Sequence, residues 1–181
     1  AFDAPGSIEE IAAQLQGGET LEERLDYVRR IVGEMRFALG VQLIGGVRDA
    51  LEVASGYARI AEAAIRVVTD ATITEYERVH GRVPGGELVI LALGRMGGAE
   101  LTHASDLDLI YLFTGDFAAD SDGTKPLGAV NYFNRLSQRV TNGLSVATAA
   151  GPLYEVDTRL RPSGADGPLS VSLEGFARYQ K

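Results

Sequence analysis

Apolar residues recur at helical spacing from the start of the chain to residue 80. A first helix is predicted to begin near Ser7 and to end at Gly17, because Ser7 is followed three residues later by Glu10, which is a capping-box pattern. Two longer helices are predicted over 20–44 and 47–80, where apolar positions repeat at i, i+3, i+4 and i+7. An amphipathic helix is stable when its apolar face is buried against another part of the protein, so these helices are expected to pack on one another and on the region that follows.

The pattern changes after residue 81, where short apolar runs alternate with glycine and proline. The segment GRVPGGE, residues 81–87, predicts a turn or short linker. Strands are predicted at 88–93, 106–113 and 153–160. Loops are predicted at 114–128 and 161–168, and helices at 129–148 and 173–180. This order predicts an α+β fold with a small mixed sheet flanked by helices, divided into a helical region over 1–84 and a second domain over 85–181.

Charge and composition narrow the possible functions. The formal net charge of −8 offers no long-range attraction to a polyanion, so binding to nucleic acid or to an anionic membrane is not expected. The chain has no cysteine, which excludes disulfides, thiolate metal ligands and a cysteine nucleophile. Neither a membrane-spanning apolar run nor a signal-peptide pattern is present, so a soluble cytoplasmic protein is expected. The absence of an initial Met and the ending FARYQK suggest a piece of a longer protein.

Two carboxylates stand at the start of the strand predicted over 106–113. Alternation along a strand places Asp106 and Asp108 on the same face. Like charges so close repel each other, and burying them is costly unless a cation lies between them. Mg²⁺, which is commonly shared between a few carboxylates and substrate phosphates, fits this need. A lone pair of this kind is more often a turn or surface feature, so it requires support from elsewhere in the chain.

A third carboxylate, Asp157, lies on the strand predicted over 153–160 and would complete a two-metal site. The same alternation places Glu155, Arg159 and Arg161 on its face. Arg159 or Arg161 could then neutralise phosphate charge through the planar guanidinium fork, although exposed arginines on an edge strand are usually only solvated. His80 and His103 are expected to have surface or packing roles.

The segment GRMGG, residues 94–98, follows a predicted strand and precedes a predicted short helix. Glycines at such a turn allow main-chain N–H groups to approach a phosphate, although the segment could also be an ordinary tight turn. A glycine turn, an Asp-x-Asp strand and a later acidic strand together predict metal-dependent phosphoryl or nucleotidyl transfer.

The segment GRMGGAELTHASDLDLIYLF, residues 94–113, resembles the signature of the glutamine synthetase adenylyltransferase family. This family belongs to the nucleotidyltransferase superfamily typified by DNA polymerase beta. The resemblance continues through YFNRLSQRV, LYEVDTRLRPSGADGPL and FARYQ, and so covers 88–180. It implies a DNA polymerase beta-like fold. Family members continue past the equivalent of Lys181 with further helices, so the domain is expected to be truncated at its C-terminus.

The resemblance also implies a function and a site. Such bacterial enzymes carry two related domains; one transfers AMP from ATP to a tyrosine hydroxyl of glutamine synthetase, and the other removes it by phosphorolysis, under control of a PII-type signalling protein. The RPSGADG segment and the YQK ending resemble the C-terminal, adenylylating domain more closely. Two Mg²⁺ ions would bind with ATP at Asp106, Asp108 and Asp157, and Asp157 would assist deprotonation of the tyrosine. The nucleotide phosphates would lie against Gly94, Gly97, Gly98 and Ser105, while Arg95 either contacts phosphate or points to solvent.

Alternative functions remain open from the sequence. The chain could be the deadenylylating domain or a related domain that transfers UMP to a PII-type protein. It could also be an inactive nucleotide-sensing or docking domain, although the presence of all three candidate carboxylates argues against this.

Overall fold

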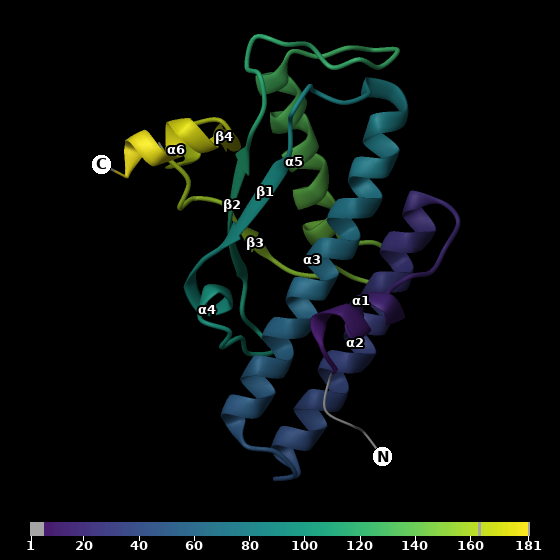
Figure 1. Cartoon of the computed structure of the whole chain (residues 1–181). Helices are drawn as coiled ribbons and strands as arrows, with labels where there is room; N and C mark the ends of the chain where they lie inside the picture. The colour runs from purple at the N-terminus through teal and green to yellow at the C-terminus, as the bar shows by residue number, and fades with distance from the viewer. Residues whose placement is uncertain (1–5, 163, 181) are drawn as a thin grey trace.

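A computed structural model describes residues 6–162 and 164–180 of the chain. Its N-terminal half is helical, with α1 (Ile8–Gln14), α2 (Leu21–Ile44) and α3 (Ala50–His80). Capping boxes begin α1 and α2, formed by Ser7 with Glu10 and by Thr20 with Glu23. The helices predicted from apolar spacing are therefore confirmed. Helices α2 and α3 form a long antiparallel hairpin whose tip is at the bottom of Figure 1.

Helix α3 is at the centre of the packing, since it contacts α1, α2 and α5 (Ala129–Ser145). One continuous cluster of buried apolar side chains extends from Ile11 in α1 to Tyr154, which lies between α5 and the last strands. In α5 the buried face includes Phe133, Leu136 and Val140, as expected for an amphipathic helix. The helical hairpin and the sheet thus share a common core.

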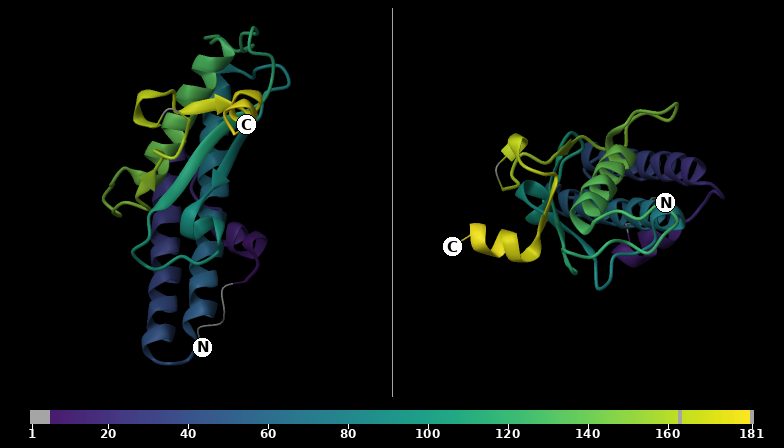
Figure 2. Two further views of the ribbon diagram at one scale, coloured as in Figure 1. Left: turned by 90° about the vertical axis from the view of Figure 1, so that its left-hand side faces the viewer. Right: turned by 90° about the horizontal axis from the view of Figure 1, so that it is seen from above.

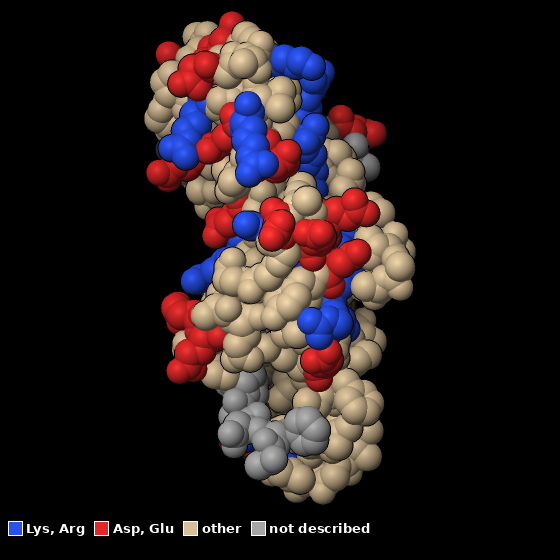
Figure 3. All heavy atoms as spheres, turned by 90° about the vertical axis from the view of Figure 1, so that its right-hand side faces the viewer, with Lys and Arg blue, Asp and Glu red and all other residues tan. Residues whose placement is uncertain are grey.

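The tip of the hairpin is unusually apolar. Residues 37–47 contain no charged side chain, and the face drawn in Figure 3 shows few charges at this lower end. The exposed large apolar side chains of the tip are Phe37, Val41, Leu43, Ile44, Val47 and Leu51. The rest of the same face carries mixed acidic and basic side chains (Figure 3).

The sheet is mixed and has four strands: β1 (Leu88–Ala92), β2 (Leu107–Phe113), β3 (Val156–Asp157) and β4 (Ser170–Ser172). Strand β2 is central; it runs antiparallel to β1 and parallel to β3 and β4. The predicted α+β class with a small mixed sheet is confirmed. Figure 2 shows α3 and α5 on one side of this sheet, while α6 (Leu173–Tyr179) lies away from the helical hairpin.

One predicted strand is wrong, and one observed strand was missed. The strand expected over 153–160 is reduced to β3, because the Arg159 N–H donates to Asp157 Oδ1 at 2.8 Å and turns the chain away from the sheet. Strand β4 was not predicted; its three residues pair with Tyr111–Phe113 at the other end of β2. The segment before it, predicted as a loop, contains the short 3₁₀ helix η1 (Gly164–Asp166). Ser163 lies outside the described residues.

The segment GRMGG was predicted to be a turn that precedes a short helix; instead it forms the short helix α4 (Gly94–Gly97) itself, and the chain from there to β2 is irregular. The polar segment over 114–128 forms a loop that is bonded to the end of α3, where the Gly123 N–H donates to the His80 carbonyl at 3.0 Å. In the part of the chain that the structure describes, none of the helices is long and apolar enough to cross a bilayer.

Candidate functional site

Strand β2 places two of the three predicted carboxylates at one end of the sheet. Its core-facing residues, among them Leu107, Leu109 and Tyr111, are fully buried, which fixes the strand and the direction of its other face. Asp108 is on that other face and is half-buried, while Asp106 immediately precedes the strand and is exposed. The core therefore determines where Asp108 lies, while Asp106 stands at the end of the irregular segment that leads into the strand.

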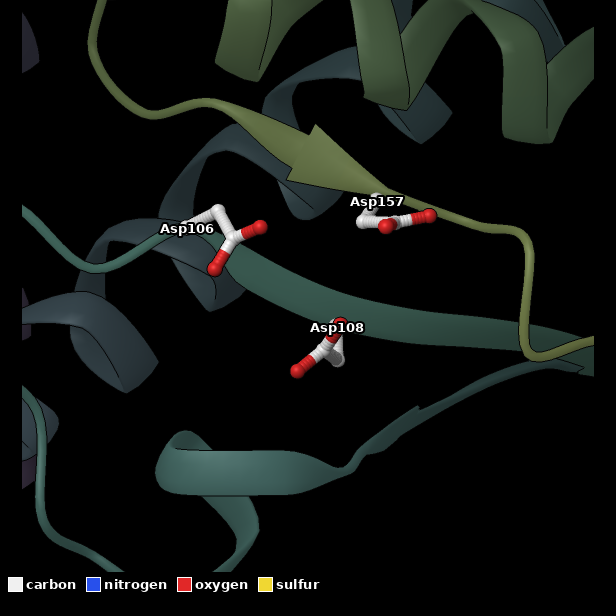
Figure 4. A group of neighbouring side chains, drawn as sticks. All are labelled: Asp106, Asp108 and Asp157. Carbon is white, nitrogen blue, oxygen red and sulfur yellow. The ribbon is translucent and has the colours of Figure 1, made fainter.

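The third carboxylate, Asp157, reaches the same place from β3. Asp157 pairs with Asp108 in the parallel register, and the Leu107 N–H donates to the Glu155 carbonyl at 2.9 Å. One carboxylate oxygen from each of Asp106, Asp108 and Asp157 lies within 4.8 Å of the others. Figure 4 shows these three side chains close together, Asp106 just before β2, Asp108 near the start of β2 and Asp157 on the neighbouring strand β3. We refer to these three residues as the acid cluster.

The negative charges of the acid cluster repel one another. Partial burial raises the pKa of Asp108, and the negative charges of Asp106 and Asp157 raise it further, while Arg159 acts in the opposite sense. A cation at this place would relieve the repulsion. Three carboxylates with converging oxygen atoms, partly open to solvent, fit the donor set that a hard divalent ion such as Mg²⁺ prefers.

Arg159 already provides one positive charge here. Its Nε lies 2.9 Å from Asp157 Oδ2, and its side chain is 79% exposed. The side-chain and main-chain bonds from Arg159 lower the pKa of Asp157 to about 2. The expectation that Arg159 and Arg161 share a strand face with Asp157 is wrong, because the chain leaves the sheet after Asp157. Arg159 reaches the acid cluster through this turn instead.

Arg161 is placed differently. Its guanidinium donates to the carbonyls of Thr158, Gly167 and Pro168, so it holds the two ends of the 158–168 loop together. Of the two predicted phosphate-binding arginines, the structure therefore brings Arg159 to the acid cluster and uses Arg161 within the loop.

The glycine turn lies against the acid cluster. Gly94 has a positive φ of 53°, and a Cβ at this position would lie 2.2 Å from Asp108 Oδ2, so a side chain cannot be accommodated without moving the carboxylate. A Cβ on Gly97 would lie 2.8 Å from the Ala92 carbonyl. Gly98 is less restricted, and Arg95 is exposed on α4. The main chain at Gly94 thus closely approaches a candidate metal ligand.

Ser105 and the histidines have local partners. The Ser105 hydroxyl accepts a hydrogen bond from the Thr102 N–H at 3.0 Å and lies 2.8 Å from Thr102 Oγ1. These bonds form a turn directly before Asp106. His80 lies 2.7 Å from the Lys125 carbonyl, and the His103 ring meets Tyr57 edge-on, in agreement with the expected packing and surface roles.

The sequence did not indicate the part that Arg36 plays. This residue of α2 donates to the His103 carbonyl and to the Leu153 carbonyl, which precede the two strands that bear the acid cluster. Both bonds connect residues far apart in sequence, and an arginine within an amphipathic helix gives no signal of such a contact.

Comparison with known proteins agrees with the resemblance read from the sequence. The family model described as "Glutamate-ammonia ligase adenylyltransferase" matches residues 3–181. Proteins named "Bifunctional glutamine synthetase adenylyltransferase/adenylyl-removing enzyme" are similar to the chain. That of Rhizobium meliloti (strain 1021) is 43% identical over 172 residues, covering 94% of this chain and 17% of the relative. That of Xanthobacter autotrophicus is 40% identical over 181 residues, covering 99% of this chain and 18% of the relative.

The chain thus spans less than a fifth of the length of these relatives. Within that span the match includes the glycine turn and the complete acid cluster. The chain therefore belongs to the glutamate-ammonia ligase adenylyltransferase family, whose members are enzymes of the nucleotidyltransferase type.

Proposed function

We propose that the chain is a nucleotidyltransferase domain that transfers AMP from ATP to a tyrosine hydroxyl of glutamine synthetase, and so regulates nitrogen assimilation. The observation that carries this proposal is the acid cluster, whose three carboxylates converge beside a turn that requires glycine at Gly94. Membership of the family supports the choice of reaction, and the names of the relatives support the choice of protein substrate.

Asp106, Asp108 and Asp157 would hold the metal, proposed as two Mg²⁺ ions. When bound, Mg²⁺ neutralises phosphate charge and lowers the pKa of an attacking hydroxyl. The like-charge repulsion within the acid cluster supports this role, since it leaves the carboxylates in need of a cation.

The remaining candidate residues would bind and orient the nucleotide. Gly94 carries no side chain beside Asp108, so the main chain there can come close to phosphate oxygens. The N–H groups of Gly97 and Gly98 already donate to the carbonyls of Leu93 and Gly94, so these two glycines would act by shaping the turn around the phosphates. Arg159 is largely exposed at the edge of the acid cluster, and its planar fork suits phosphate oxygens. Ser105 would act mainly by holding the turn before Asp106, and Arg161 by shaping the loop. Arg95, exposed on α4, is available to phosphate or solvent.

Asp157 is proposed to assist deprotonation of the acceptor hydroxyl. A carboxylate with a pKa of about 2 is a weak base, so this role requires Arg159 to move away from Asp157 when substrate is present. Transfer of Arg159 from the carboxylate to a substrate phosphate would both raise the basicity of Asp157 and stabilise the nucleotide.

The proposed setting is the bacterial cytoplasm, with a PII-type signalling protein acting through the full-length enzyme. No role in binding nucleic acid or membrane is proposed, since the net charge of −8 opposes contact with polyanions.

The direct test is to mix the chain with unmodified glutamine synthetase from the same source, Mg²⁺ and ATP, and to measure the intact mass of the synthetase subunit. We expect the mass to increase by one AMP unit. Asp106→Asn should abolish the increase, whereas Asp120→Asn, a matched change at an exposed carboxylate of the 114–128 loop, should retain it. If neither wild type nor variants bind Mg–ATP in calorimetry, the chain is better explained as an inactive docking domain.

The second candidate is removal of AMP by phosphorolysis, which is favoured by the words "adenylyl-removing enzyme" in the names of the relatives. Incubation with adenylylated glutamine synthetase and inorganic phosphate would then release ADP. ADP release without transfer from ATP would assign the chain to the removing reaction.

A further inference from the structure

Two chain segments bring the residues of the acid cluster together, and strand pairing in the sheet fixes the positions of these segments only in part. Asp106 follows an irregular segment between α4 and β2, with His103 three residues before it. Asp157 follows another irregular segment between α5 and β3, with Leu153 four residues before it. Strand β3 pairs with β2 over two residues only, so its ladder provides little restraint.

The guanidinium of Arg36 lies between these two segments. Its Nη1 donates to the Leu153 carbonyl at 3.1 Å, and its Nη2 donates to the His103 carbonyl. The partners are 117 and 67 residues away in sequence. One side chain of α2 therefore connects the segment that leads to Asp106 with the segment that leads to Asp157.

The position of Arg36 is itself well defined. Its guanidinium carbon lies 4.9 Å from the ring centroid of Tyr154, which is buried. The Tyr57 hydroxyl, from α3, donates to the Arg36 carbonyl at 3.2 Å. The Tyr57 ring also meets the His103 ring, with centroids 6.1 Å apart. Contacts with Tyr57 of α3 and with Tyr154 thus fix the arginine, and Tyr57 also contacts one of the segments that Arg36 binds.

From this geometry we infer that Arg36 is a positioning residue for the metal site: it sets the separation between Asp106 and Asp157 by bonding both of the segments that carry them. The inference rests on the proposed function, since it assumes that the acid cluster binds a divalent ion. Arginine suits the task because its rigid planar fork can donate in two fixed directions at once. The ammonium of a lysine is a point donor on a flexible stem and cannot reproduce that pair of bonds.

A residue with a stabilising role alone would have a different signature. Loss of its contacts would lower the melting temperature, but folded molecules would bind metal as before. Loss of a positioning residue weakens metal binding in molecules that remain folded, because the ligands no longer adopt the required separation.

The test is a calorimetric titration of Mn²⁺ alone into the chain, its Arg36→Ala and Arg36→Lys variants, and two controls. Arg30→Ala is the matched control, because Arg30 is on the same helix and its ion pair with Glu34 is exposed. Asp106→Asn defines the loss of a ligand. Circular dichroism at the titration temperature establishes that each variant is folded.

Arg36→Ala is expected to weaken Mn²⁺ binding by about 10- to 100-fold, the usual effect of removing a group that orients metal ligands. Arg30→Ala should bind as wild type does, and Arg36→Lys should be clearly weaker than wild type. Wild-type affinity in folded Arg36→Ala overturns the inference. If Arg36→Ala fails to fold, wild-type affinity in Arg36→Lys overturns it instead. If wild type binds Mn²⁺ no better than Asp106→Asn, the proposed metal site itself is wrong and the inference falls with it.

Discussion

Strands β2 and β3 both bring carboxylates to the acid cluster, yet they are held by different means. Strand β2 has seven residues, of which all but Asp108 are buried, and it pairs on both edges. Strand β3 has two half-buried residues and pairs only with β2. Asp108 is therefore placed by the hydrophobic core, whereas Asp157 depends on individual hydrogen bonds, including those of Arg36 and Arg159. A single site can thus combine a rigid half with a half that depends on a few polar contacts.

The largest expected effect is the loss of AMP transfer when a carboxylate of either strand is replaced, because the reaction needs the carboxylates of both strands. Asp108→Asn and Asp157→Asn should each reduce AMP transfer by at least about 1000-fold, because each removes a ligand of an ion worth several kcal/mol to the transition state. The increase in mass of glutamine synthetase with time gives the rates. Near wild-type transfer by Asp157→Asn would rule out both its ligand role and its role as a base.

Truncation of an apolar side chain should lower the free energy of unfolding more in β2 than in β3. Leu109, fully buried in β2, and Val156, half-buried in β3, allow a comparison of truncations to alanine. Leu109→Ala should cost about 3 kcal/mol of unfolding free energy, through lost burial and the cavity left behind. Val156→Ala should cost about 1 kcal/mol. Urea unfolding at neutral pH without metal measures both values, and equal costs would contradict the distinction between a rigid and a weakly held strand.

The same contrast explains what the sequence could predict. The long helices and β2 were predicted because their apolar residues repeat over many positions, and the pairing of Asp106 with Asp108 follows from the period of a strand. The length of β3 was overestimated because the bond from the Arg159 N–H to Asp157 Oδ1 is a local alternative to strand pairing that alternation does not reveal. Strand β4 has too few residues to give a pattern. The contacts of Arg36 depend on tertiary packing and leave no local signal.

Substitution of Arg159 tests one of the polar contacts around β3 and is expected to have a smaller effect on stability than the truncations above. It holds the pKa of Asp157 at about 2, below the usual 3.8, so its contribution to stability is present above pH 3.8 and is lost as the pH falls toward 2. Arg159→Ala should therefore lower the melting temperature slightly at pH 7, and the difference from wild type should disappear near pH 2. The effect is small because the Arg159 side chain is mostly exposed to solvent.

Thermal unfolding across this pH range, with an NMR titration of the Asp157 carboxyl group, measures both parts of the prediction. The pKa of Asp157 should rise toward its usual value in Arg159→Ala. An unchanged Asp157 titration in the variant would show that Arg159 does not pair with Asp157 in solution.

The smallest expected effect concerns Asp108 on the rigid strand β2. Here a substitution is expected to raise the melting temperature, whereas Arg159→Ala lowers it. Burial and the neighbouring carboxylates raise the pKa of Asp108, so the metal-free fold loses stability as the pH rises from 3.8 to that raised pKa, and the loss is complete once Asp108 is ionised in the fold. Asp108→Asn should raise the melting temperature at pH 7 without metal, and the gain should vanish below pH 3.8, where Asp108 is protonated in both the folded and unfolded states. Asp120→Asn serves as the control and should not show this gain.

Addition of Mg²⁺ should reverse the order of stability at pH 7. Wild type would gain stability from the bound ion, since a ligand that binds only the folded state stabilises it. Asp108→Asn, which lacks a ligand, would gain little. If Asp108→Asn remains the more stable protein at saturating Mg²⁺, then the repulsion within the acid cluster is not relieved by a divalent ion, and the rigid strand presents its carboxylates for another purpose.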